Sequence, residues 1–306
     1  MAGITGATYP SSGTDYYTRV IFPKKMLRQL YATSIYELIS NTDYEGEIKE
    51  GGDTVNIAVD PIVTDFAYDA AVGIPSYIEP TTAGVKLNID QARGFAYKIK
   101  SSSEAASHLP LKESFARSAT AQIKVSIDKN VLAFWATQVD SHNMGATAGA
   151  ISADINLGVT GTPRTVTAAN IMHFIHQCNQ VLDEQNVGEM SRWITLPAWM
   201  VTLLKDSDIK DASVTGDSKG TIRTGVLGMI DGFLLHRSNN LPWHVANKES
   251  TIMFGVNEAT TFAAQLTEIS SGQLENDYGQ YFRGLTVFGR GVVQPKMVGA
   301  AVVKAA

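Results

Sequence analysis

The sequence predicts an α+β fold, and three observations support this. Apolar residues recur at helical spacings of three and four in three stretches, residues 23–40, 111–139 and 168–186. Apolar and polar residues alternate with a period of two over 54–60 and 85–100, as in half-buried strands. Residues 214–304 are rich in Gly, Thr, Val and Phe with short alternating runs and frequent turns, so we expect mostly strands there.

The composition excludes several classes of protein. The chain has 306 residues, 25 Lys and Arg, 30 Asp and Glu, a net charge of −5 and a hydrophobic fraction of 44%. These values exclude a disordered chain, a collagen and a strongly basic nucleic-acid-binding domain. Charged residues make up only 18% of the chain, against roughly 25% in an ordinary soluble domain, so we expect copies of the chain to cover part of its surface.

Length and targeting signals bound the organisation of the chain. The chain exceeds the roughly 250 to 300 residues that one hydrophobic core usually serves, which predicts two lobes or one lobe with long excursions. Its one cysteine, Cys178, cannot close an intrachain disulfide. The N-terminus carries no signal-peptide pattern, and no apolar stretch approaches 18 residues, so we expect a soluble, unexported protein.

The first hundred residues predict an arm, a helix and a long hairpin. Residues 1–20 are rich in Gly, Ser and Tyr and lack apolar periodicity, which is typical of an extended arm. Pro23 opens the predicted helix 23–40. Two strands, near 54–60 and 85–100, flank an irregular segment at 61–84. A lone hairpin is marginally stable in water, so its apolar face needs a partner outside the hairpin.

The charges along this hairpin are unevenly distributed. Residues 50–85 hold six acidic residues and no Lys or Arg, whereas residues 86–129 hold eight basic and four acidic residues. Segments of opposite sign suit head-to-tail contact between copies of one chain. We expect the acidic side of this contact at Asp60, Asp65, Phe66, Tyr68, Asp69, Tyr77 and Glu79. A complementary basic surface is expected at Lys98, Lys100, Lys112, Arg117 and Lys124.

The rest of the chain predicts a long helix and a mixed lobe. The apolar stripe of residues 111–139 repeats every four residues, drifts around the helix and must meet successive partners. Residues 141–163 are rich in Gly and Ala and read as a boundary. Thr167 is a candidate cap for the helix 168–186, and Pro197 opens a third helix.

The motifs that suggest catalysis or metal binding lack the required context. His173 and His176 lie on the helix face opposite Cys178, so the three side chains do not converge on a metal. Ser218 in Gly-Asp-Ser-Lys-Gly matches a nucleophile elbow, but neither a buried strand nor a helix flanks it. Asp206, Asp208 and Asp211 resemble a calcium loop with Lys210 at a ligand position. We expect no cofactor, no metal and no catalytic residue.

One segment is more specific. LGMIDGFLLHRSNNLP, residues 227–242, resembles the Gly-Phe-x-x-x-x-Ser-Asn-Asn-Leu-Pro stretch that recurs in tailed-bacteriophage major capsid proteins. NTDYEGEIKEGGDTVNI, residues 41–57, is similar to the start of the extended loop of that family, where a Gly-Asp-Thr-Val run begins the hairpin. The order of arm, helix, hairpin, long helix, mixed lobe and returning strands also resembles theirs and spans nearly the whole chain.

The resemblance implies a domain organisation and a structural role for the motif. It implies the following parts: an N-terminal arm at 1–22, a first helix at 23–45, an extended loop at 46–100, a peripheral domain at 101–145 and 257–293, and an axial domain at 146–256 and 294–306. Asparagine tolerates left-handed backbone and bonds its own main chain, so we expect a structural turn at Ser238, Asn239, Asn240, Leu241 and Pro242.

The resemblance also implies function, partners and location. The chain would assemble into hexamers and pentamers of an icosahedral shell that encloses double-stranded DNA, in the virion, after assembly in the bacterial cytoplasm. Because no long charged helical segment precedes the first helix, we expect a separate scaffolding protein, besides a portal and a decoration protein. Two alternatives stay open: a hydrolase that uses Ser218 or a metal site at His173 and His176, and a ring-forming tail-tube protein.

Overall fold

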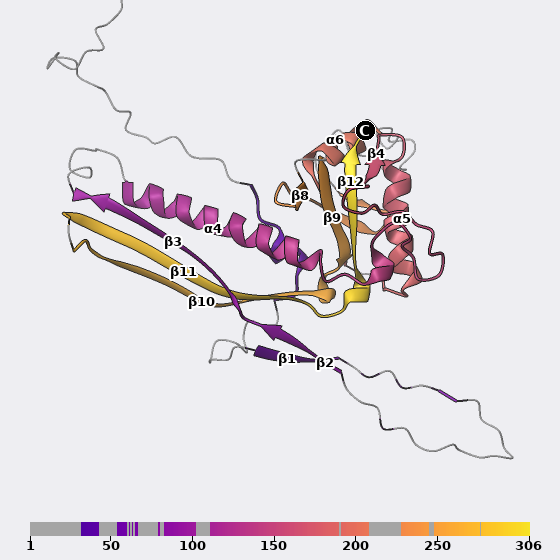
Figure 1. Ribbon diagram of the computed structural model, residues 1–306, viewed down its shortest axis with the longest axis horizontal. Coiled ribbons are helices and arrows are strands. Elements are labelled where there is room, and N and C mark those ends of the chain that lie inside the picture. Colours follow the sequence, from indigo (N-terminus) through magenta and orange to yellow (C-terminus); the bar gives the residue numbers. More distant parts are fainter. Residues whose placement is uncertain are drawn as a thin grey trace, which may run out of the picture.

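The protein consists of an elongated half and a compact lobe (Figure 1). The computed structural model describes residues 32–42, 54–59, 61, 63, 65, 66, 79, 83–101, 111–189, 191–207, 228–244, 248–275 and 277–306. Helices and strands are both well represented in these residues, so the predicted α+β class is confirmed.

The elongated half is a long helix that lies along a three-stranded antiparallel sheet (Figure 1). The helix is α4 (Leu111–Trp135), and the strands, in sheet order, are β10 (Thr260–Gln273), β11 (Gly279–Val292) and β3 (Gln91–Lys100). Aromatic rings fill part of the interface, since the Tyr97 ring lies 5.9 Å from Phe115 of α4 and 5.3 Å from Phe282 of β11. Tyr97 therefore marks the face of β3 that looks toward the helix.

Burial along α4 is uneven. The residues Val125, Ile127, Val131, Leu132 and Trp135 are buried, whereas the N-terminal half is half-buried or exposed and Phe115 is 37% exposed. The predicted winding stripe is thus buried in the second half only. The helix also ends at Trp135 and not at 139, because residues 136–139 continue as turns.

The compact lobe is built on a seven-stranded mixed sheet. Six strands follow the order β4 (Arg164–Val166), β12 (Val298–Ala305), β9 (Glu249–Val256), β5 (Arg192–Leu196), β7 (Phe233–Arg237) and β6 (Met229–Ile230). The seventh, β8 (Trp243–His244), pairs with β9. The central strands β5 and β9 are buried almost throughout, which is the pattern of a sheet covered on both faces.

In the part of the chain that the structure describes, two α-helices belong to the compact lobe. The first, α5 (Ile171–Glu184), buries the predicted apolar face, namely Ile171, Phe174, Ile175, Cys178, Val181 and Leu182. Its N-cap residue is Asn170 and not Thr167, whose backbone N–H donates to the Asn170 side chain at 2.8 Å. The second, α6 (Ala198–Asp206), begins directly after Pro197, as predicted.

The hairpin differs from the prediction in one respect. Strands β1 (Thr54–Val59) and β2 (Ala83–Asn88) pair antiparallel, with Ile57 opposite Val85. The predicted continuous strand over 85–100 is wrong, because β2 pairs with β1 whereas β3 pairs with β11. The chain changes sheets between Asn88 and Gln91, so residues 91–100 belong to the sheet under α4.

The first helix is shorter than predicted within the described residues. Residues 32–35 are not helical, and α1 covers only Tyr36–Ile39. The rest of the predicted helix 23–40 and the arm lie outside the described residues. The described residues also form three short 3₁₀ helices: η1 (Ser141–Asn143), η3 (Asn257–Ala259) and η4 (Pro295–Met297). Among the described helices, none combines the length and apolarity needed to cross a membrane.

Polar side chains fix the boundary segment 141–163 onto the compact lobe. The Glu184 carboxylate, at the end of α5, accepts hydrogen bonds from the backbone N–H groups of Ile151 at 2.8 Å and Ser152 at 3.0 Å. These bonds outweigh the opposing effect of burial and lower the pKa of Glu184 to about 2. Asn143 is buried, and its side-chain N–H group donates to the carbonyls of Lys296 and Val298.

Gly158 gives a test of how tightly this segment is held. Its φ is +80°, and an added Cβ would collide with the Val302 carbonyl on β12. We expect Gly158→Ala to lower the free energy of unfolding by about 3 kcal/mol, from backbone strain together with overpacking. Gly161 is the matched control, because its φ is +93° but a Cβ there would meet nothing within 4 Å. Gly161→Ala should cost about 1 kcal/mol in thermal unfolding, and equal costs would contradict the packing argument.

Candidate functional site

A buried carboxylate lies where three parts of the chain meet. Asp128, in the second half of α4, is fully buried. One oxygen, Oδ1, accepts hydrogen bonds from the backbone N–H groups of Ile35 at 3.1 Å and Tyr36 at 3.0 Å, at the start of α1. The other oxygen, Oδ2, accepts a hydrogen bond from the Asn240 side-chain N–H group at 2.7 Å. We call this arrangement the Asp128 junction.

The Asp128 junction gives α1 the cap that its own sequence lacks. The N-cap residue of α1, Ile35, has no side chain that can accept a hydrogen bond, and the first N–H groups of a helix need an acceptor. The Asp128 carboxylate supplies that acceptor from another helix, and negative charge is favourable at a helix N-terminus. The short helix is thereby fixed against α4.

Burial determines the protonation behaviour of this carboxyl. Removal from water raises the pKa of Asp128 above its ordinary range, and the negative charge of Glu37 adds to the rise. The hydrogen bonds from Asn240, Ile35 and Tyr36 act in the opposite direction without cancelling it. A raised pKa means that the carboxyl of the folded chain binds its proton more readily than that of the unfolded chain.

The predicted Ser-Asn-Asn-Leu-Pro turn supplies the third part of the junction. It connects β7 to β8, and Ser238, Asn240 and Leu241 are buried whereas Asn239 is exposed. The Ser238 hydroxyl accepts a hydrogen bond from the Asn240 backbone N–H group at 3.1 Å, and the Pro242 carbonyl accepts one from Thr251 at 2.9 Å. The turn thus aims the Asn240 side chain at α4, a role that sequence reasoning did not find.

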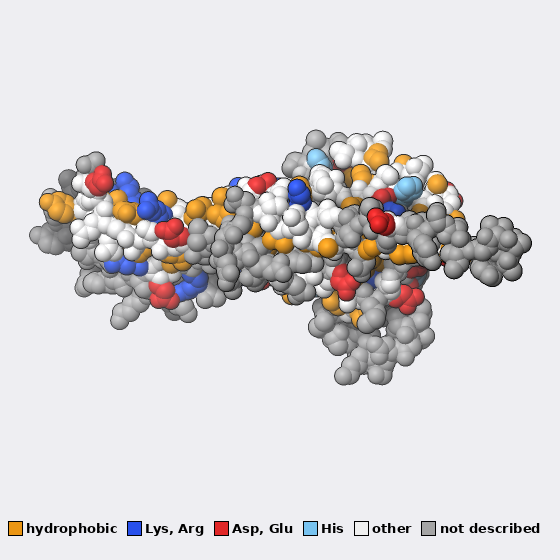
Figure 2. All heavy atoms as spheres, turned by 90° about the horizontal axis from the view of Figure 1, so that it is seen from below, with side chains coloured by type: hydrophobic (Ala, Val, Ile, Leu, Met, Phe, Trp, Pro, Cys, Tyr) orange, Lys and Arg blue, Asp and Glu red, His pale blue; other side chains and the backbone are white. Residues whose placement is uncertain are grey.

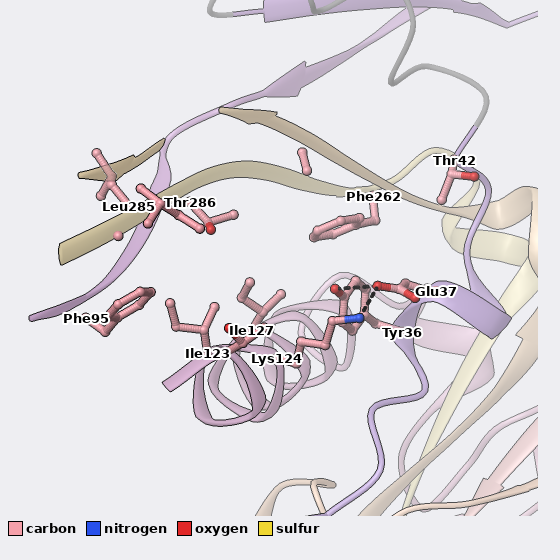
Figure 3. A pocket seen from close by; sticks show the side chains of 14 residues that line it. Tyr36, Glu37, Thr42, Phe95, Ile123, Lys124, Ile127, Phe262, Leu285 and Thr286 are labelled. Atoms are coloured by element: carbon pink, nitrogen blue, oxygen red, sulfur yellow. Dashed lines mark hydrogen bonds and ion pairs between the residues drawn. The ribbon is translucent and has the colours of Figure 1, made fainter. Parts of the chain in front are cut away.

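A cavity of about 470 Å³ lies beside the junction, between α1, α4 and the three-stranded sheet. Figure 3 shows Phe95, Ile123 and Ile127 on one side and Tyr36 and Phe262 on the other. At its mouth, the Lys124 ammonium lies 3.7 Å from the Glu37 carboxylate, to which the Tyr36 hydroxyl also donates at 2.9 Å. The walls thus combine apolar side chains with a charged pair and with three threonines, Thr42, Thr120 and Thr286.

The five predicted basic residues lie on two different layers. Lys98 and Lys100 alternate with Tyr97 on β3 and therefore lie on the sheet face away from α4. The other three, Lys112, Arg117 and Lys124, lie on α4. Figure 2 looks at the molecule from the sheet side and shows basic and acidic side chains together at the end of the elongated half.

Three of these cations already have acidic partners in their own chain. Lys100 lies 2.8 Å from Asp277, Arg117 lies 2.7 Å from Glu113, and Lys124 pairs with Glu37. All three pairs are exposed, and because water and salt screen such pairs, each contributes little to stability. The five residues predicted to form the basic surface are therefore divided between two layers, and part of their charge is balanced within the chain.

The predicted acidic loop residues are described only in part. Asp65, Phe66 and Glu79 are exposed, and Phe66 retains 51% of its accessible surface. Asp60, Tyr68, Asp69 and Tyr77 lie outside the described residues. The exposed Val63, at 72%, adds a second apolar side chain to this loop.

The candidate catalytic and metal residues do not gather. His173 is exposed, His176 pairs with Asp231 at 2.9 Å, and Cys178 is fully buried, which raises the pKa of its thiol. Within the described ranges, no group of three His, Cys, Asp or Glu residues is placed to hold a metal. Ser218, Asp208 and Asp211 lie outside those ranges.

Comparison with solved structures finds chains with the same fold. The chain is similar over 94% of its length to 97% of a chain titled "Mycobacterium phage Che8", with 22% identity and a TM-score of 0.76. It is similar over 98% of its length to 99% of a chain in the capsid of cyanophage P-SCSP1u, with 16% identity and a TM-score of 0.71. A third similar structure is the capsid of a native GTA particle, with 12% identity, a TM-score of 0.66 and coverage of 99% and 100%.

These similarities define the fold. No family model and no curated protein matches the sequence. The structural likeness spans nearly the whole of each chain, so this protein has the fold of tailed-phage capsid proteins, and that expectation is confirmed.

Asn240 gives the sharpest test of the Asp128 junction. Asn240→Ala removes the hydrogen bond to a buried carboxylate and leaves its Oδ2 unpaired, so we expect the free energy of unfolding to fall by about 2 to 3 kcal/mol. This exceeds the cost of about 1 kcal/mol for one neutral hydrogen bond. The control is Asn239→Ala, whose exposed side chain should change stability by less than about 0.5 kcal/mol. Similar thermal midpoints for both variants would contradict the role of the junction.

Proposed function

We propose that this chain is a major capsid protein that assembles into hexamers and pentamers of an icosahedral shell around packaged double-stranded DNA. The observation that carries the proposal is the match of fold over 98% of this chain and 99% of the cyanophage capsid chain. The low charged fraction of 18% supports it, because a surface covered by neighbouring copies needs fewer charges. The net charge of −5 also suits a container, since a basic lining would hold the packaged DNA and resist its release.

In this proposal each part of the chain has one task. Residues 1–22 form the arm, and the loop 46–88 reaches over a neighbouring subunit. The sheet of β10, β11 and β3 with α4 forms the peripheral domain, and the compact lobe forms the axial domain around which capsomers close. This assignment rests on the fold likeness and on the strand pairing, which separates the three-stranded sheet from the seven-stranded sheet.

The loop contact between copies is part of the proposal. The exposed Val63 and Phe66 supply apolar surface, and the exposed Asp65 and Glu79 supply negative charge. A neighbouring subunit would receive them on the far face of its three-stranded sheet, where Lys98 and Arg283 are exposed. The apolar groups would give the contact most of its strength, since exposed ion pairs contribute little.

The remaining parts of the proposal concern partners and chemistry. The chain acts as a structural protein without catalysis, and assembles in the bacterial cytoplasm with a separate scaffolding protein and a portal before it becomes part of the virion. A decoration protein is a further proposed partner.

Electron microscopy of the purified full-length chain tests the proposal directly. Closed regular shells, formed alone or with a co-expressed scaffolding protein, are the expected result. Open tubes or stacked rings would instead indicate a tail-tube protein. A hydrolytic turnover that disappears with Ser218→Ala, in a preparation that forms no particles, would favour an enzyme.

Deletion of the loop tip tests the contact between copies. We replace residues 61–84 by a short Gly-Ser linker and expect a folded monomer, with unchanged far-ultraviolet circular dichroism, that forms no shells. The reason is that the tip carries exposed apolar side chains that its own chain does not cover. The matched control, Asp65→Asn with Glu79→Gln, should still assemble but with lower sensitivity to salt. Normal shells from the deletion variant would contradict the proposed contact.

The lysine distribution predicts how the shell is held together. No lysine lies between Lys49 and Lys86, so the loop tip has no amine that could form an isopeptide bond to a neighbour. We expect a non-covalent shell, and denaturing electrophoresis of mature particles should give a single band near 33.0 kDa. A ladder of covalent multimers in boiled, reduced samples would contradict this.

A further inference from the structure

The two ends of the Asn240 side-chain amide are unequally satisfied. The nitrogen, Nδ2, donates to Asp128 Oδ2 at 2.7 Å and to the Thr33 carbonyl at 3.3 Å. The oxygen, Oδ1, is buried and has no hydrogen-bond partner among the described residues. A buried polar atom without a hydrogen bond lowers the free energy of unfolding. A new donor near Oδ1 would therefore find an acceptor there.

Protonation of Asp128 changes what the amide faces. The ionised Oδ2 is an acceptor, which suits Nδ2, whereas a protonated Oδ2 becomes a donor and opposes it. A half-turn of the Asn240 amide brings Oδ1 to accept the new O–H group. The same half-turn places Oδ1 against the Thr33 carbonyl, so two acceptors then face each other and the Thr33 hydrogen bond is lost.

We propose that Asp128 and Asn240 form a proton-operated switch, which holds the segment before α1 through Thr33 when the carboxyl is ionised and releases it when the carboxyl is protonated. The proton comes from solvent, and the O–H bond is the only covalent bond formed. The Ile35 and Tyr36 N–H groups keep an acceptor in both states, but a neutral oxygen accepts more weakly than a carboxylate. The released state therefore loosens residues 32–36 without unfolding the lobe.

The surrounding charges permit such a switch. On α1, Glu37 acts on Asp128 and favours its protonated form. On α4, Lys124 pairs with Glu37 and Lys129 is exposed. The turn 238–242 contains no titratable group, and Arg237 before it is exposed. Burial raises the pKa of Asp128. The carboxyl is therefore protonated at a higher pH than that of an ordinary aspartate, whose pKa is about 3.9.

The raised pKa of Asp128 determines how the stability of the fold changes with pH. A carboxyl whose pKa is higher in the folded chain contributes its full stability below the unfolded pKa and loses it as the pH rises through the folded pKa. Protonation of Asp128 at low pH therefore stabilises the folded state relative to the unfolded state, although it breaks the local hydrogen bond to the Thr33 carbonyl. Global acid unfolding and release of the segment are thus distinguishable.

Hydrogen exchange measured by mass spectrometry on the full-length chain tests the switch. After correction for the intrinsic exchange rate, we expect protection of peptides that cover residues 32–42 to fall about five- to tenfold as the pH drops through the Asp128 pKa, as expected for loss of one hydrogen bond. The buried strand β5 is the internal control and should keep its protection. A parallel loss in β5 would mean global unfolding and would overturn the proposal.

Three variants decide whether Asp128 and Asn240 are responsible. Asp128→Asn mimics the protonated carboxyl, because its amide both accepts and donates, so it should give the low protection at every pH. Asn240→Ala removes the donor to Thr33 and should lower protection at neutral pH. In Glu37→Gln the pH-dependent fall in protection should remain but occur at a lower pH, because the charge of Glu37 raises the pKa of Asp128. The proposal is overturned by wild-type protection in Asp128→Asn or Asn240→Ala at neutral pH, or by loss of the pH-dependent fall in Glu37→Gln. Because the exchange is read on unassembled protein, the outcome is independent of the proposed shell.

Discussion

The fold depends on a buried carboxylate, that of Asp128, which hydrogen bonds stabilise. In the described part of the chain, no salt bridge joins Asp128 to a Lys or Arg, and its acceptors are satisfied by Ile35, Tyr36 and Asn240. These donors lie about a hundred residues away along the chain, on both sides. An unpaired buried charge is strongly destabilising, so α1, α4 and the turn after β7 must all be in place together. The junction thereby makes the elongated half and the compact lobe one cooperative unit.

Apart from the Asp128 junction, the elongated half has few buried residues of its own to stabilise it. The buried residues of α4 end toward its middle, and the first half of the helix rests on a ladder of rings from Phe95, Tyr97 and Phe282. Ile269 is 69% exposed, Leu285 is 40% exposed, and both line the nearby cavity. Since exposed apolar surface of this kind marks contact with other molecules, the same half that lacks a complete core is the half best suited to neighbouring copies.

Periodicity predicted the elements whose burial is decided locally. The apolar face of α5 follows from spacing alone, and Pro197 marks the start of α6. Asp128 could not be found this way, because an acidic residue in a helix normally faces water; its position beside Ile127 and Val131 in the apolar stripe was the available signal. The break between β2 and β3 was also missed. The apolar residues up to Ile89 and those from Phe95 onward both fall on odd-numbered positions, so the two strands share one phase, and the polar Gln91 and Arg93 between them were the available signal.

The charge pattern shows why sequence complementarity overstates electrostatic attraction between copies. Counted along the chain, residues 86–129 carry an excess of four positive charges, but Lys100, Arg117 and Lys124 are paired within the chain. Water and salt screen an exposed pair, so exchanging an internal partner for one on a neighbouring copy changes the free energy little. The remaining electrostatic effect is the field of the unequal charges, which orients approaching subunits within a Debye length of about 8 Å. Charge would therefore set the orientation of the contact, and the apolar loop residues would set its strength.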